Sequence, residues 1–307
     1  MQKTAIEWVF NPDGTRPGYT WNPITGCLNG CSYCYARKLA NGRLKQKYLA
    51  NVYGLDNDPK ISNAEFRKHA EDPFYPRFWT ERLEDIKREP LPWFHRGKDL
   101  RKGIFVCDMG ELFGDWIPQR WQDDIFGIIK LHSQHRFYLL TKQPQNLVKF
   151  SPFPENCWVG VTATNRDTYT LAIYHLGRIK APIKFISFEP LLSKVMDSWF
   201  TPAIFPAAFE DKSEAQVMVN KGVNWLILGA CTGTLNDLKS LALKYPELTL
   251  MPLNKLSGRQ WTLQPKREWI LDIIAAASVK SIPIFLKNNL SPLLGSDLRQ
   301  EMPNGLP

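Results

Sequence analysis

Short, almost wholly apolar runs recur after residue 102, and each ends in polar residues. They are Gly103–Cys107, Phe137–Leu140, Trp158–Val161, Ile183–Ser187, Trp225–Leu228 and Ile282–Leu286. Runs of this kind are typical of parallel strands that are buried on both faces. Two apolar stripes with helical spacing, starting at Trp121 and at Trp269, fall between runs. The pattern therefore predicts an α/β protein built from alternating strands and helices.

Repeated strand–helix units imply a parallel sheet with right-handed crossovers. A short strand over 19–25, broken by Pro23, brings the predicted strands to seven, one short of a complete β/α barrel. We therefore expect a partial, irregular parallel β/α barrel that forms one domain over 1–307. Loop or short-helix insertions are expected at about 54–102, 193–222 and 234–258. Shorter helices are predicted over 36–53 and 78–87.

Polar residues follow the ends of successive predicted strands. In β/α barrels the active site lies at these carboxyl ends. The residues concerned are Asp108, Glu111, Thr141, Lys142, Thr162, Thr164, Asn165, Glu189, Lys287 and Asn288. Strand ends are often polar because loops are exposed, but the repetition predicts a shared functional site.

Three cysteines, Cys27, Cys31 and Cys34, have the spacing C-x3-C-x2-C. Three thiolates in one turn suit an iron–sulfur cluster whose fourth iron site stays open for another ligand. Gly26 and Gly30 allow the backbone to wrap closely around such a group. Zinc is the alternative, but it requires a fourth ligand from elsewhere in the chain, because the other cysteines and the histidines show no metal-ligand spacing.

The chain carries 39 Lys and Arg against 30 Asp and Glu, a formal charge of +9. Residues 1–102 hold 18 of these bases and 12 of the acids, so the excess gathers around the cysteines. Aromatic and arginine residues interleave between 74 and 102. This balance fits either a polyanion such as nucleic acid or an ordinary solvated surface. The sequence offers no apolar leader and no membrane-length apolar run, so we expect a cytoplasmic protein.

The cysteine spacing, with Tyr33 just before the last cysteine, resembles the signature of the radical S-adenosylmethionine (SAM) superfamily. The resemblance implies that Cys27, Cys31 and Cys34 bind a 4Fe–4S cluster and that SAM chelates its fourth iron. Met109–Gly110–Glu111 is similar to the Gly-Gly-Glu motif that holds the SAM amino group, with a departure at the first position. The other SAM contacts that the resemblance implies are Thr162, Thr164 and Asn165 for the ribose, and Tyr33, Gly229 and Ala230 for the adenine.

The phrases TWNPITGC, FVCDMGELF, LLTKQPQNL, ISFEPLL and ILGACTG resemble a phage-associated family of uncharacterised radical-SAM-like proteins. Its members tend to carry Gly-Gly-Glu-Ser-Gly in the last phrase, where this chain has Gly229–Ala230–Cys231–Thr232–Gly233. The role of that glutamate therefore does not carry over to this chain.

The resemblance implies reductive cleavage of SAM to a 5′-deoxyadenosyl radical, with electrons from a donor such as flavodoxin or ferredoxin. Lys142, Glu189 and Lys287 are then candidates for substrate contact, and Cys107 is a candidate donor of a hydrogen atom. Charge and aromatics make nucleic acid, a nucleotide or a nucleobase the candidate substrate. Two other functions stay open: a zinc-stabilised nucleic-acid-binding protein without catalysis, and a non-catalytic iron–sulfur protein.

Overall fold

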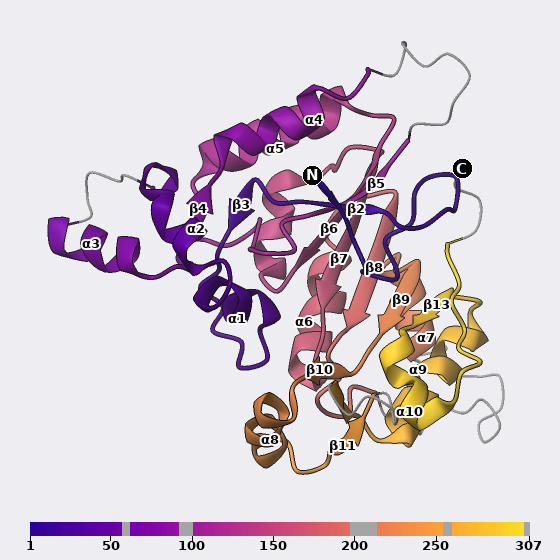
Figure 1. The fold of residues 1–307 in the computed structure, drawn as a ribbon. Helices are drawn as coiled ribbons and strands as arrows, with labels where there is room; N and C mark the ends of the chain where they lie inside the picture. Colours follow the sequence, from indigo (N-terminus) through magenta and orange to yellow (C-terminus); the bar gives the residue numbers. More distant parts are fainter. Residues whose placement is uncertain (57–61, 92–100, 197–213, 254–259, 304–307) are drawn as a thin grey trace. The chain divides into compact units, whose positions relative to one another are not determined.

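A computed structural model describes residues 1–56, 62–91, 101–196, 214–253 and 260–303 (Figure 1). The chain divides into two compact units, Met1–Trp158 (unit 1) and Val159–Leu306 (unit 2). Each unit is described by itself, and a single domain over 1–307 stays a prediction. Among the described residues, no helix has the length and apolar character needed to cross a membrane.

The sheet of unit 1 holds four strands in the order β1 (Gln2–Lys3), β2 (Tyr19–Trp21), β5 (Gly103–Val106) and β6 (Arg136–Thr141). The edge strand β1 runs antiparallel to β2, whereas β2, β5 and β6 are parallel. Aromatic side chains fill the core beside them, and the Trp8 ring lies 5.0 Å from that of Phe105. The strands predicted from the runs at 103 and 137 are therefore confirmed.

The remaining elements of unit 1 surround this sheet. The helices are α1 (Tyr35–Asn41), α2 (Lys45–Ala50), α3 (Asn63–Glu71), α4 (Glu84–Lys87) and α5 (Gln119–Leu131). Short 3-10 helices occur at Val52–Gly54, Thr80–Leu83 and Pro144–Phe150. A two-stranded antiparallel sheet pairs β3 (Ile24–Thr25) with β4 (Arg77–Phe78). Helix α5 carries the apolar stripe that starts at Trp121, as predicted.

The strand predicted over 19–25, with a break at Pro23, is found as two strands, β2 and β3, on either side of that proline. Two other local predictions in unit 1 need correction. The predicted helix over 36–53 breaks at Gly42, whose N–H closes α1 on the carbonyls of Lys38 and Leu39. The predicted helix over 78–87 begins instead with the end of β4 and a 3-10 turn, so only Glu84–Lys87 is α-helical. Two stretches of the first insertion, 57–61 and 92–100, lie outside the described residues.

The main sheet of unit 2 has the order β7 (Cys157–Thr162), β8 (Ile183–Phe188), β9 (Trp225–Leu228) and β13 (Ile284–Leu286), with β7 belonging to this unit from Val159 on. Strands β8, β9 and β13 are parallel. The helices are α6 (Arg166–Leu176), α7 (Glu214–Asn220), α8 (Leu235–Lys244), α9 (Arg267–Val279) and α10 (Ser291–Leu294), and a 3-10 helix spans Asn288–Leu290. All four predicted strands are confirmed, as is the predicted stripe of α9.

A second sheet in unit 2 was not predicted. It is antiparallel, in the order β10 (Cys231–Gly233), β12 (Trp261–Gln264) and β11 (Thr249–Pro252). The expectation of only loops or short helices over 234–258 is therefore wrong for β11, although α8 agrees with it. Residues 254–259 and most of the insertion predicted at 193–222 (197–213) lie outside the described residues.

Candidate functional site

The three cysteines lie on the turn that leads from β3 into α1, here called the Cys turn (Cys27–Cys34). Its first residues are fixed by main-chain bonds: the N–H of Gly26 donates to Met109 O at 2.9 Å, and that of Cys27 to Phe74 O at 3.1 Å. Gly26 has a φ of +89°, and a Cβ there would lie 2.5 Å from the carbonyl oxygen of Tyr75. Only glycine fits this position, which holds the Cys turn against the loop after β5.

All three thiols are half-buried and none forms a disulfide. The Sγ of Cys27 accepts the N–H of Asn29, and the Sγ of Cys34 accepts that of Arg37 as the N-cap of α1, both at 3.3 Å. The pKa of Cys27 is raised to about 12, chiefly by burial; the N–H of Asn29 opposes this shift, and nearby Glu111, Cys31 and Cys34 contribute to it.

The fit of these thiols to a metal centre rests on their chemistry and on their shared turn. Within the described ranges, no three His, Cys, Asp or Glu side chains converge as a metal site. The thiols must therefore turn toward a common centre to bind one. Three soft donors with backbone N–H groups aimed at two of the sulfurs fit an iron–sulfur cluster, whose sulfurs take such hydrogen bonds.

Glu111, which follows β5, connects the Cys turn to the end of β6 through hydrogen bonds. It is 4% exposed, and its carboxylate accepts hydrogen bonds from Thr141 Oγ1 at 2.7 Å, the N–H groups of Phe113 and Lys142 at 3.1 Å each, and Asn29 Nδ2 at 3.3 Å. Each oxygen takes two of the four. The predicted proximity of Glu111 to the cysteines is found, because Asn29 lies within the Cys turn.

A second link joins the same turn to β6. Gln143, just past β6, donates its side-chain amide to Asn29 Oδ1. The Lys142 ammonium lies 6.0 Å from the centre of the Tyr33 ring, which is a cation–π distance. Lys142, Tyr33 and Glu111 therefore lie together with the Cys turn in unit 1, as the sequence predicted.

Asp108, just past the end of β5, is the last member of this group of residues. Its carboxylate accepts from Asn22 Nδ2 at 2.6 Å and from the Tyr35 hydroxyl at 3.3 Å, and burial raises its pKa against these bonds. Neighbouring Cys107 is buried with a φ of 58°. Burial also raises the pKa of its thiol, which stays protonated at neutral pH. A protonated thiol is the form that a hydrogen-atom donor requires.

The candidates of unit 2 form a group of their own at the ends of β7, β8, β9 and β13. Thr162 and Ser187 are 4% and 1% exposed, and neither hydroxyl has a hydrogen-bond partner among the described residues. Glu189 and Lys287 form an ion pair with side chains 26% and 14% exposed. Gly229 lies between them, since a Cβ there would be 3.0 Å from Lys287 Cδ and 3.2 Å from Glu189 Cγ.

Other predicted SAM contacts in unit 2 already hold structural bonds. The side chain of Asn165 is the N-cap of α6, where it accepts the Thr168 N–H at 2.9 Å. The carbonyl of Thr164 accepts the N–H of Leu192 at 2.9 Å. Asn289, which the sequence did not single out, holds both main-chain groups of Ala230, at 3.0 Å and 2.8 Å.

Sequence reasoning also missed Asn22, Asn29, Gln143 and Ser187. Two signals were present. Asn29 is an amide inside the cysteine motif, and Ser187 is a polar residue inside an otherwise apolar strand end. Asn22 and Gln143 have no comparable signal, because their partners are distant in the chain.

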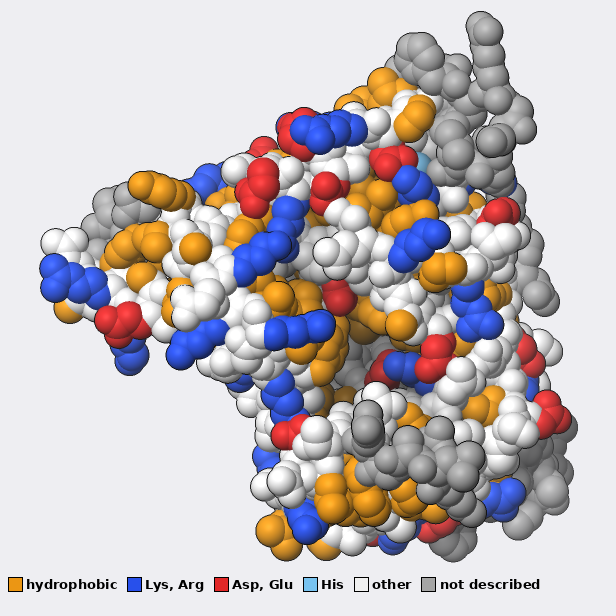
Figure 2. Space-filling view, viewed as in Figure 1, with side chains coloured by type: hydrophobic (Ala, Val, Ile, Leu, Met, Phe, Trp, Pro, Cys, Tyr) orange, Lys and Arg blue, Asp and Glu red, His pale blue; other side chains and the backbone are white. Residues whose placement is uncertain are grey.

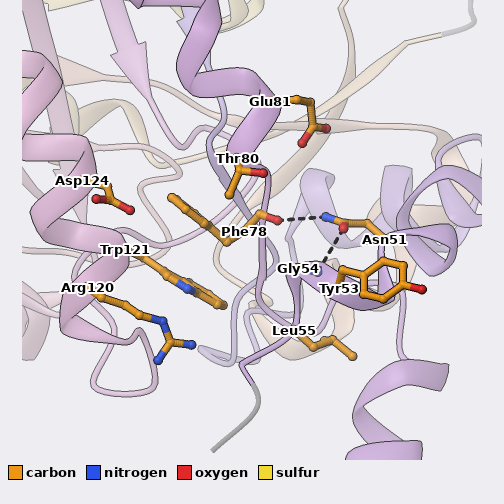
Figure 3. A pocket seen from close by; sticks show the side chains of 10 residues that line it. All are labelled: Asn51, Tyr53, Gly54, Leu55, Phe78, Thr80, Glu81, Arg120, Trp121 and Asp124. Atoms are coloured by element: carbon orange, nitrogen blue, oxygen red, sulfur yellow. Dashed lines mark hydrogen bonds between the residues drawn. The ribbon is translucent and has the colours of Figure 1, made fainter.

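A separate pocket in unit 1, with a volume of about 320 Å³, contains none of the predicted site residues (Figure 3). The rings of Phe78 and Trp121 stack at 5.3 Å beside it, and the fully exposed Tyr53 lies on its lining. Lys and Arg side chains are spaced over the part of unit 1 that holds α1, α2 and α3, with few acidic ones between them (Figure 2). Arg43, Lys45 and Lys47 of this part are exposed.

A family profile described as "Protein of unknown function (DUF5131)" matches residues 3–238, most of the chain. The chain belongs to the DUF5131 family. No curated protein matched this DUF5131 sequence.

Solved structures of spore photoproduct lyase resemble this DUF5131 chain at low identity. A double mutant of the lyase with bound AdoMet and dinucleoside spore photoproduct has a TM-score of 0.50 and 9% identity over 87% of this chain and 75% of the lyase. A complex with dinucleoside spore photoproduct has a TM-score of 0.47 and 10% identity over 86% and 74%. The fold is α/β with a mostly parallel sheet and resembles the partial barrel of the radical-SAM type, which confirms the predicted fold class.

Proposed function

We propose that this DUF5131 protein is a radical-SAM enzyme that acts on a nucleic acid, a nucleotide or a nucleobase. The observation that carries the proposal is the attachment of a three-cysteine turn to the ends of two parallel strands through one buried carboxylate. Gly26 fixes the start of the turn beside Gly110, and Asn29 joins it to Glu111. The likeness in fold to a lyase structure that contains AdoMet supports the same reading.

In this proposal Cys27, Cys31 and Cys34 hold a 4Fe–4S cluster with one open iron site. The bound cluster and SAM supply reductive cleavage of a C–S bond to a 5′-deoxyadenosyl radical. The carboxylate of Glu111 would hold the SAM ammonium beside the Cys turn, to which Asn29 connects it. Tyr33, Gly110, Thr162, Thr164, Asn165, Gly229 and Ala230 remain the predicted contacts to the rest of SAM.

The substrate class is proposed from charge and from the fold relative. Lys and Arg outnumber Asp and Glu in residues 1–102. The exposed side chains of Arg43, just before α2, and of Lys45 and Lys47 within it offer contacts to phosphates. The related lyase structures hold a dinucleoside photoproduct. Lys142, Glu189 and Lys287 are the proposed substrate contacts, Cys107 is the proposed hydrogen-atom donor, and flavodoxin or ferredoxin is the proposed electron donor.

The decisive experiment is anaerobic reconstitution with iron and sulfide, followed by chemical reduction in the presence of SAM. We expect about four irons per chain, as the cluster requires, and formation of 5′-deoxyadenosine. Replacing Cys27, Cys31 or Cys34 with Ala removes both. Cys157→Ala is the control, because Cys157 is a buried cysteine of β7 outside the Cys turn.

Three outcomes contradict the proposal in different ways. A colourless protein that contains zinc favours the nucleic-acid-binding alternative. A loaded cluster that yields no 5′-deoxyadenosine favours a non-catalytic iron–sulfur protein. Full iron content in all three Cys→Ala variants refutes the ligand assignment itself.

A further inference from the structure

Two buried hydroxyls lie side by side on one face of the main sheet of unit 2. The N–H of Ala163 donates to Ser187 O at 2.9 Å, and in a parallel ladder this bond places Thr162 next to Ser187. Side chains alternate along a strand, so both hydroxyls share the face of Phe185, here called the Phe185 face. A Cβ on Gly160 would lie 2.3 Å from the Phe185 ring, which agrees with this register.

The hydroxyl pair needs an explanation. Both residues are more than nine-tenths buried, and neither hydroxyl meets a partner in the described part of the chain. A buried hydroxyl without a partner destabilises a folded protein, so each one calls for an explanation such as a bound water or a functional role. The opposite face of β8 carries Phe188, whose ring lies 6.0 Å from that of Tyr169 on α6. The hydroxyls therefore point away from the helix that packs on that face.

A charged pair forms the next layer of the Phe185 face. The ladder continues past the strand ends, since Gly229 N–H donates to Phe188 O and Lys287 N–H to Leu228 O. Glu189, Gly229 and Lys287 are thus neighbours, two residues or about 6.6 Å beyond the layer of Ser187. Because Gly229 has no side chain, Glu189 and Lys287 meet across it.

The chemistry of the two layers selects a ligand. The Glu189 carboxylate and the Lys287 ammonium together have no net charge, so this layer does not attract an anion such as phosphate. A planar group with an N–H next to a carbonyl matches it, because the carboxylate accepts the N–H and the ammonium donates to the oxygen. The two hydroxyls both donate and accept, and they offer contacts to further edge atoms. The edge of a nucleobase has this alternation of donors and acceptors.

We propose that Thr162, Ser187, Glu189 and Lys287 form a subsite for the hydrogen-bonding edge of a nucleobase. The ligand separates the Glu189–Lys287 pair and inserts between its charges over Gly229. This assignment rests on the proposed function and deepens it, since it names the part of the substrate that unit 2 recognises. It assigns Thr162 to the substrate in place of the SAM ribose and leaves the other predicted SAM contacts unchanged.

The test is equilibrium binding of nucleosides to the full-length chain by saturation-transfer NMR and calorimetry, without iron or SAM. Thymidine, cytidine, adenosine and guanosine are the probes, and ribose and inorganic phosphate are the comparators. We expect thymidine, cytidine or guanosine to bind more tightly than both comparators; adenosine is also part of SAM, so its binding alone does not count. Lys287→Met should weaken that binding about tenfold and Ser187→Ala about fivefold, as expected for one charged and one neutral hydrogen bond.

Two further variants separate recognition from folding, and circular dichroism checks that each is folded. Gly229→Ala keeps both charges but puts a methyl group between them, so it should also weaken nucleoside binding. Lys266→Met removes an exposed ion pair with Glu247 in the same unit and should leave binding unchanged.

The proposal is overturned if no nucleoside other than adenosine binds, if ribose or phosphate binds as well as the best of these nucleosides, or if Lys287→Met binds it like the wild type. Because the assay contains neither iron nor SAM, its result is independent of cluster loading and of SAM cleavage. If the protein cleaves SAM but binds no nucleoside, the nucleobase subsite is refuted and the assignment of SAM cleavage stands.

Discussion

Replacing Glu111 with Gln should lower the free energy of unfolding by about 3 kcal/mol. The four donors around the carboxylate are Asn29 Nδ2, Thr141 Oγ1 and the N–H groups of Phe113 and Lys142. A glutamine has the same shape but turns one acceptor into an NH2 group. In either orientation of its amide, that group faces the main-chain N–H of Phe113 or of Lys142. At least one hydrogen bond to a charge is then lost, at roughly 1.5–3 kcal/mol, and a buried N–H is left unpaired.

Urea denaturation of the metal-free protein, followed by far-ultraviolet circular dichroism, measures this change. The midpoint should fall while the slope stays constant, because the same surface is exposed on unfolding. Glu84→Gln is the matched control: Glu84 pairs with Lys87 on an exposed helix, where such a pair contributes at most about 1 kcal/mol. If the free energy of unfolding of E111Q lies within about 0.5 kcal/mol of that of the wild type, the four hydrogen bonds of Glu111 do not hold this part of the fold together.

Three further predictions concern other parts of the chain. Gly26→Ala should cost about 2 kcal/mol or more and lower iron content after reconstitution, because its φ is positive and its Cβ meets a main-chain oxygen; unchanged iron content would contradict this. Burial lowers the pKa of His132 from 6.5, although Glu89 opposes the shift, so the unfolded chain binds the proton more readily. The contribution of neutral His132 to the free energy of unfolding should therefore be fully present above pH 6.5 and should be lost as the pH drops below it. In urea titrations at pH 7 and pH 5, His132→Phe should show a smaller loss of stability between the two pH values than the wild type. Replacing Arg43, Lys45 and Lys47 with Ala should reduce the salt slope of single-stranded DNA binding by about 2, and an unchanged slope would exclude these bases as phosphate contacts.

The main strands were predictable because each is an almost unbroken apolar run that is buried on both faces. Strands β10, β11 and β12 were not, since they are short and their pairing depends on partners up to about thirty positions away. The predicted helix over 36–53 failed at a single glycine, whose N–H closes α1. Local pattern therefore fixes elements that are long and buried, whereas short elements depend on tertiary partners.

The candidate site was likewise predictable only in part. Residues with distinctive chemistry at strand ends, such as Glu111 and Lys287, were found from the sequence. The amides that position them were not, because nothing local marks Asn29 as the partner of Glu111, 82 residues away. The same holds for Asn289, which binds Ala230 across 59 residues.

The span of the Asn29 bonds has a consequence for biosynthesis. Gln143 lies 114 residues after Asn29. At 5–20 residues per second, the ribosome needs roughly 6 to 23 s to make that stretch. The three thiols thus leave the ribosome well before the strands that hold their turn in place. Under the proposed function, a cluster delivered after residue 143 has emerged would therefore meet a Cys turn that Gln143 can hold in place.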